Sequence, residues 1–128
     1  MTLEISNDIK QEVLSAIRAI RQRVIWKPGK DIQHLDKRKS MGHIPQGYTL
    51  NDYNQLILSI VSESTNEVYL YIFGQAHYYG IVGNALGVKW LVLVSSQGVM
   101  ETAFPPDNLQ EYIDKRGFER LGKVGDFQ

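Results

Sequence analysis

The chain has 128 residues, no cysteine and a formal net charge of zero, and this length fits one domain rather than two. Without cysteine the chain has neither disulfides nor thiolate metal sites, a composition compatible with a reducing cytoplasm. No stretch approaches the ~20 apolar residues of a membrane-spanning helix, and residues 1–10 lack the basic and apolar regions of a signal peptide. We therefore expect a single cytoplasmic domain over residues 1–128, with no membrane as a partner.

The first predicted element is an amphipathic helix over residues 7–26. Apolar side chains recur at steps of three and four residues from Ile5 to Val24, so they share one face of a helix. Ser6 is a suitable N-cap because its hydroxyl can accept a hydrogen bond from a free amide of the first turn. Pro28 disfavours helical geometry at the preceding residue, so the helix is expected to end before it.

Two further helical segments are predicted in the N-terminal half. Residues 31–48 are expected to form a short helix that runs into a loop, because glycine and proline interrupt the later part. Thr49 and Asp52 have the spacing of a capping box, and a second apolar stripe follows them. The sequence therefore predicts a strong helix over residues 49–63.

The periodicity then changes from helical to strand-like. Four strands are predicted, at residues 67–73, 77–83, 88–94 and 99–104. The third strand is apolar on both faces, which indicates a central position in the sheet. In the fourth strand, simple alternation places Met100, Thr102 and Phe104 on one face.

The C-terminal part is predicted to add one more helix. Asp107 and Gln110 repeat the capping-box spacing, and the helix should end before Gly117. Residues 118–124 are a candidate edge strand. The expected fold is therefore α+β, with N-terminal helices packed on a four-stranded, mostly antiparallel sheet and a short C-terminal helix.

Several common reaction centres are absent from the sequence. The carboxylates are scattered, and the histidines His34, His43 and His77 do not have the spacing of metal ligands. The chain has no phosphate-binding glycine loop of the Walker or dinucleotide type and no Gly-x-Ser-x-Gly motif. We therefore expect a site that uses neither a metal nor a cofactor.

A basic segment follows the first predicted helix. Residues 1–46 carry nine Lys or Arg and five Asp or Glu, whereas residues 47–128 carry five and nine. A local positive patch can attract a polyanion even when the whole chain is neutral. The same residues also fit a solvated helix face followed by a polar loop. The candidate functional residues of this segment are His34, Lys37, Arg38, Lys39 and His43.

RNA cleavage without a metal needs only side chains of these types. A base takes a proton from the ribose 2′-hydroxyl, a cation stabilises the charge on the phosphorane, and an acid protonates the leaving 5′ oxygen. Histidine suits the acid or base role, and lysine or arginine suits the electrostatic role. In a helix, His34 shares a face with Lys37 or Arg38.

The predicted sheet offers further candidates for substrate binding. Thr102 either presents its hydroxyl to a phosphate or serves only as a good strand former. Lys89 interrupts an apolar strand. Its ammonium group either contacts substrate or extends into solvent from an edge of the sheet. His77 and Tyr79 lie at a strand start, where an aromatic ring either packs in the core or stacks on an unpaired base.

Four segments, in this order along the chain, resemble a known class of ribonucleases. HLDKRK follows the first helix, GYTLNDYNQLILSIV forms a tyrosine-containing helix, and KWLVLVSSQG precedes VMETAFPP. This order is similar to the Barnase–EndoU–colicin–RelE class of toxin ribonucleases, especially its phage and polymorphic-toxin branches, over residues 30–122. The resemblance implies N-terminal helices on a four-stranded sheet and RNA cleavage without a metal. It assigns catalysis to His34, to Lys37 or Arg38, and to Thr102, with Lys39 or His43 as a second basic group.

The expected function is a metal-independent endoribonuclease of the toxin type. Such an enzyme cuts RNA to give a 2′,3′-cyclic phosphate and is held in check by an antitoxin or immunity protein. An alternative is a non-catalytic interaction protein, because the neutral charge and the aromatic residues of the sheet suit a protein interface. A small-ligand binding domain is a third hypothesis.

Overall fold

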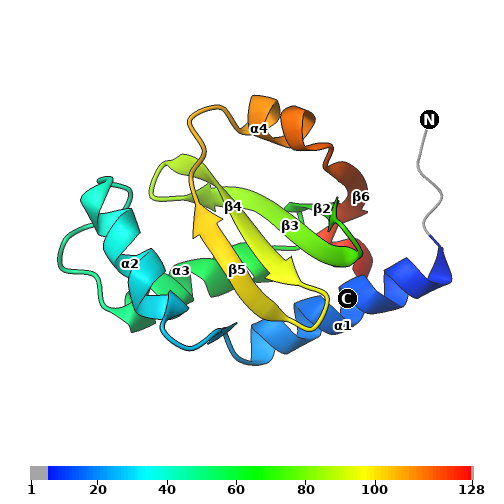
Figure 1. The fold of residues 1–128 in the computed structure, drawn as a ribbon, viewed down its shortest axis with the longest axis horizontal. Helices are drawn as coiled ribbons and strands as arrows, with labels where there is room; N and C mark the ends of the chain where they lie inside the picture. The colour runs from blue at the N-terminus through cyan, green and yellow to red at the C-terminus, as the bar shows by residue number, and fades with distance from the viewer. Residues whose placement is uncertain (1–5, 128) are drawn as a thin grey trace.

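Four helices, one 3-10 helix and a six-stranded mixed sheet make up residues 6–127, the part of the chain that the computed structural model describes (Figure 1). The helices are α1 (Asn7–Gln22), α2 (Lys30–Ser40), α3 (Leu50–Ser62) and α4 (Leu109–Arg116), and η1 (Val124–Phe127) is the 3-10 helix. The strands are β1 (Ile25–Trp26), β2 (Glu67–Phe73), β3 (Ala76–Ala85), β4 (Val88–Ser95), β5 (Val99–Phe104) and β6 (Glu119–Lys123). The predicted α+β class is confirmed.

Short polar side chains begin three of the helices. Ser6 caps α1 as predicted, and its hydroxyl accepts a hydrogen bond from the Ile9 amide at 3.3 Å. The predicted capping box of α3 is present in both directions between Thr49 and Asp52. For α4 the predicted cap, Asp107, was wrong by one position, because the side chain of Asn108 accepts the amide of the first turn.

The predicted four-stranded sheet is extended at both edges. The strand order is β1-β5-β4-β3-β2-β6, and the predicted strands form an antiparallel meander with β4 inside the sheet. β6 pairs antiparallel with β2, and β1 pairs in parallel with β5. β1 was missed because two residues are too short to show a strand period, and its residues had been included in the first helix, which ends at Gln22.

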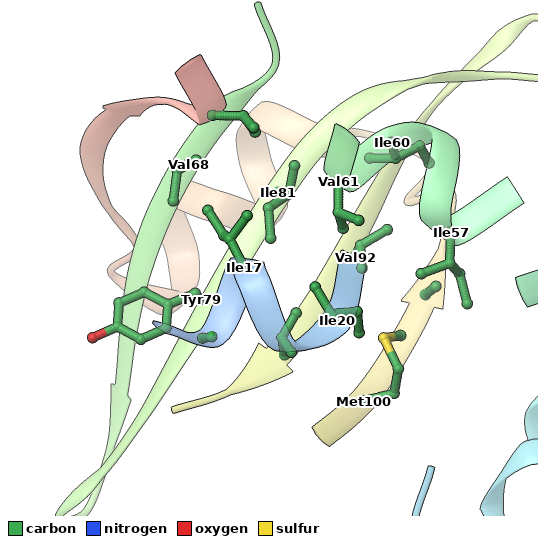
Figure 2. Packing of buried hydrophobic residues seen from close by; sticks show 14 of the residues in the cluster. Ile17, Ile20, Ile57, Ile60, Val61, Val68, Tyr79, Ile81, Val92 and Met100 are labelled. Atoms are coloured by element: carbon green, nitrogen blue, oxygen red, sulfur yellow. The ribbon is translucent and has the colours of Figure 1, made fainter. Parts of the chain in front are cut away.

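The helices cover both faces of the sheet (Figure 1). Apolar residues of α1 and α3 pack on one face and form the larger core, in which Ile17, Ile57 and Val92 are almost fully buried (Figure 2). On the other face Ile113 of α4 packs with Leu91 and a few neighbours in a smaller cluster. No helix within residues 6–127 is long and apolar enough to cross a membrane.

A β-bulge in β5 overturns the predicted alternation of that strand. Met100 pairs with Val94 and Thr102 pairs with Leu93, so Glu101 is an extra residue without a partner of its own. Met100 therefore faces the larger core, whereas Phe104 packs in the cluster beneath α4. Thr102 and Phe104 both follow the bulge and are two residues apart, so their side chains share one face of the sheet. Met100 precedes the bulge and points to the other face, so the prediction that all three residues share a face was wrong.

Candidate functional site

The candidate site lies where α2 runs beside β5 (Figure 1). His34 Nδ1 is 3.4 Å from the Thr102 hydroxyl, and the Arg38 guanidinium lies over the Phe104 ring, 5.5 Å from its centroid. From His34 to Arg38 the helix advances by about 6 Å, and from Thr102 to Phe104 the strand advances by about 6.7 Å. The two contacts between α2 and β5 therefore form side by side. The structure thus brings together His34 and Thr102, which are 68 residues apart in the chain.

Trp26 forms one wall of the site. Its ring centroid is 5.2 Å from that of His34 and 5.7 Å from that of Tyr53. The indole N–H donates a hydrogen bond to Asn54 Oδ1 at 3.0 Å, and the backbone of Trp26 pairs with Met100 in the sheet. Sequence reasoning missed this residue because it fell at the end of the predicted first helix.

Tyr53 supports the site from the core side. It is fully buried, and its hydroxyl donates a hydrogen bond to the Ala103 carbonyl at 2.6 Å, which ties α3 to β5. Burial raises the pKa of the phenol well above its ordinary value, so the hydroxyl stays a neutral donor. The strand that carries Thr102 is therefore held at a fixed position beneath α2.

Burial and the surrounding charges keep the His34 imidazole neutral. Burial is the largest of the causes that lower the pKa of His34 below its ordinary value of 6.5. The positive charges of Arg38, Lys30 and Lys37 lower the pKa further, and Glu101 opposes them. An imidazole with a pKa below 6.5 is uncharged at neutral pH and can accept a proton, as a general base must.

Replacing Lys30 and Lys37 together by alanine should raise the pKa of His34 toward 6.5. Both ammonium groups disfavour the imidazolium form, so their loss lets the ring take up its proton at a higher pH. An NMR titration of the His34 ring protons in both proteins measures the shift. Lys39→Ala, on the same helix, should leave this titration unchanged, and an equal shift in that variant would contradict the assignment of the two charges.

Of the two cations that the sequence offers beside His34, only Lys37 is exposed. The Arg38 side chain is 4% exposed, and its Nη1 donates a hydrogen bond to His43 Nδ1 at 3.2 Å. Its Nη2 points to Met41 Sδ at 4.0 Å. Arg38 and His43 therefore interact with each other, one helical turn away from the contact between His34 and Thr102.

His77 and Tyr79 belong to a separate cluster. The Glu12 carboxylate of α1 accepts the Tyr79 hydroxyl at 2.5 Å and lies 2.9 Å from His77 Nδ1. The Tyr79 ring is fully buried, so it is not available to stack on a base as the sequence suggested. These contacts join α1 to the sheet.

Lys39 lies near the end of α2, and Lys89 lies four residues along β4 from Leu93, the strand partner of Thr102. Lys39 is half-buried near the end of α2, where its carbonyl accepts a hydrogen bond from Gln46 Nε2 at 2.8 Å. Lys89 is exposed at the start of β4, opposite Asn84. β4 is an interior strand, so Lys89 does not lie on an edge strand as the sequence suggested.

Glu101 and Lys27 form a rim that sequence reasoning did not find. Their side chains are both exposed, and Lys27 Nζ lies 4.0 Å from Glu101 Oε2. The bulge turns Glu101 outward beside Thr102, and its carboxylate acts on the titration of His34. An exposed pair at this distance contributes little to stability, so its effect on the site is electrostatic.

Comparisons with known proteins do not assign the site. No family model matches the chain, no curated protein matches it, and no solved structure matches it. In the part of the chain that the structure describes, no group of three or more histidine or acidic side chains could hold a metal ion. What the chain does is therefore inferred from the side chains between α2 and β5.

Proposed function

We propose that the chain is a metal-independent endoribonuclease of the toxin type, in the Barnase–EndoU–colicin–RelE class. The contact between His34 Nδ1 and the Thr102 hydroxyl carries this proposal. It joins a helix and a strand that are distant in sequence and holds a neutral imidazole among cationic groups. A neutral base beside positive charge is the combination that transesterification of an RNA phosphodiester requires.

His34 acts as the general base in this proposal. When Nδ1–H donates to the Thr102 hydroxyl, the Nε2 lone pair is left to take the proton of the ribose 2′-hydroxyl. The 2′ oxygen then forms a bond to phosphorus, and the bond from phosphorus to the 5′ oxygen breaks. The exposed ammonium of Lys37 stabilises the phosphorane and supplies the proton to the leaving 5′ oxygen. The products are a 2′,3′-cyclic phosphate and a free 5′-hydroxyl.

The test is incubation of the purified chain with transfer RNA in the presence of EDTA. We expect fragments that end in 2′,3′-cyclic phosphate, identified by mass spectrometry, and fragments whose 5′ ends can be phosphorylated directly. A matched RNA with 2′-deoxyribose at the cleaved position should stay intact, because it lacks the attacking hydroxyl. Intact RNA in the presence of well-folded protein would contradict the proposal.

A second candidate function is binding to a protein partner without catalysis. The end of β2 exposes two consecutive apolar side chains, Ile72 at 53% and Phe73 at 68%. Exposed aromatic and aliphatic residues of this kind are frequent at protein interfaces, and an antitoxin or immunity protein would be such a partner. A cell-growth phenotype that His34→Gln leaves intact but Phe73→Asp abolishes would favour binding over RNA cleavage.

A further inference from the structure

Arg38 is a buried cation that lacks a counterion among residues 6–127. It is the only buried charged residue found there, and it takes part in none of the ion pairs. Its Nε has no hydrogen-bond partner, although the atom is fully buried. A buried charge without a partner is costly, so native proteins normally pair such a group with an opposite charge. The missing partner therefore points to an anion that binds from outside the chain.

A pocket of about 200 Å³ adjoins this guanidinium. Lys37, Met41 and His43 line it on the side of α2 and the following turn, and residues 104–107 line it on the side of β5. A water molecule occupies about 30 Å³, so the space admits a group as large as a phosphate. Asp107 is the one acidic residue of the lining, and the two cations Arg38 and Lys37 outnumber it, so the net charge of the lining is positive.

The chemistry of this pocket favours an oxyanion. Guanidinium groups bind phosphate through two parallel N–H donors, and Arg38 has N–H groups that only a neutral imidazole and a thioether contact. The guanidinium also lies over the Phe104 ring in a cation–π contact. His43 accepts from Arg38 through Nδ1, so its Nε2 carries a proton that can also be donated to an anion.

We infer that the Arg38 pocket binds one phosphate group of an RNA strand, next to the phosphate that is cleaved beside His34 and Thr102. His34 and Arg38 are one turn apart on α2, about 6 Å along the helix axis. This advance is close to the distance between consecutive phosphates of an RNA strand. The RNA part of the inference rests on the proposed ribonuclease function, whereas the binding of an anion by Arg38 does not.

Inorganic phosphate is the first probe. At ten times its Kd it should raise the Tm of the wild-type chain by about 3–6 °C, and it should shift the NMR signals of the His43 ring. Arg38→Met should lose both responses, and it should fold, because removing an unpaired buried charge is often neutral or stabilising. Arg38→Lys is a second variant that keeps the charge but not the two-pronged geometry, and it should bind phosphate more weakly.

Two controls decide whether the response belongs to this pocket. Lys115→Met removes an exposed cation on α4 and should keep both responses of the wild type. Responses that persist in Arg38→Met would overturn the inference. A larger response to acetate than to phosphate would also overturn it and would indicate a carboxylate of a partner protein as the occupant.

Short RNA substrates then test the position of the pocket along the strand. A terminal phosphate added to a dinucleoside monophosphate, at the 5′ or the 3′ end, should raise the wild-type kcat/KM by about tenfold or more. Arg38→Met should lose this gain. If neither terminal phosphate changes kcat/KM, the neighbouring-phosphate assignment fails while the ribonuclease stands. If RNA is not cleaved but Arg38-dependent phosphate binding is observed, the ribonuclease fails while the anion pocket stands.

Discussion

Replacing His34 by glutamine should lower the rate of RNA cleavage by about 10²–10⁴-fold, the range typical of a lost general base. Glutamine keeps a polar group near the Thr102 hydroxyl and the Trp26 ring, which are the contacts of the imidazole. It cannot take up a proton at neutral pH, so the 2′-hydroxyl would lose its base. Single-turnover cleavage of a short RNA with saturating protein measures the chemical step directly.

The matched control for this variant is His77→Gln. His77 is also half-buried, but it contacts Glu12 in the separate cluster between α1 and β3. Its replacement should leave the cleavage rate within a few-fold of the wild type. Equal losses in the two variants, or a His34→Gln protein that cleaves normally, would contradict the role of His34 as base. The acid limb of the wild-type pH profile should lie below pH 6.5, because burial and the neighbouring cations lower the pKa of His34.

Replacing Trp90 by alanine should cost about 3–5 kcal/mol of folding free energy, as expected for a large aromatic side chain removed from a core. Trp90 is fully buried among the residues of the larger core, and its indole N–H donates to the Ala85 carbonyl at 3.1 Å. Small domains are stable by only about 5–15 kcal/mol, so the variant should be marginally folded. Urea denaturation followed by far-UV circular dichroism gives the difference.

Phe73→Ala is the matched control for this core substitution. Phe73 is 68% exposed at the end of β2, so removal of its ring should change the free energy of unfolding by less than about 0.5 kcal/mol. A loss below about 1 kcal/mol for Trp90→Ala would contradict the burial of Trp90 in the larger core. The His43 ring meets the Trp90 ring edge-on, with the centroids 6.5 Å apart. The NMR signals of His43 should therefore shift in Trp90→Ala, and unchanged signals would also contradict this packing.

Local sequence signals were sufficient for most of the fold. The capping box between Thr49 and Asp52 is a contact within one helical turn, and the structure contains it as predicted. The strand at residues 67–73 was predicted with the bounds that β2 has, because its apolar and aromatic side chains alternate along the chain. In both cases the neighbours that decide the structure are close in sequence.

Features that depend on distant partners were not visible in the sequence. Ile25 and Trp26 become a strand only because β5 pairs with them. The bulge at Glu101 is set by the register with Leu93 and Val94 and leaves no mark in the alternation of the strand itself. Sheet structure depends on such cross-strand context, so the predicted strands lie close to their observed bounds while the pairing of β1 and the bulge in β5 were missed.

Residue chemistry and the resemblance pointed to His34 and Thr102, but not to the burial of Arg38 or the position of Trp26. His34 and Thr102 were named from chemistry and from a resemblance, and the structure places their polar atoms 3.4 Å apart. The burial of Arg38 could not be foreseen, because a run of basic residues such as Lys37, Arg38 and Lys39 normally faces solvent. Trp26 was missed because tryptophan carries no acid–base signal, although its ring shields one side of the imidazole.

The separation of 68 residues between His34 and Thr102 has a consequence for biosynthesis. While the ribosome is still making the chain, the imidazole of α2 emerges first and β5 only much later. A nascent or truncated polypeptide that stops before Thr102 has the basic helix but lacks the strand on which that helix is held. Proteins with such long-range contacts acquire them late in folding, so an incomplete chain is expected to be inert toward the RNA around it, including the message from which it is translated.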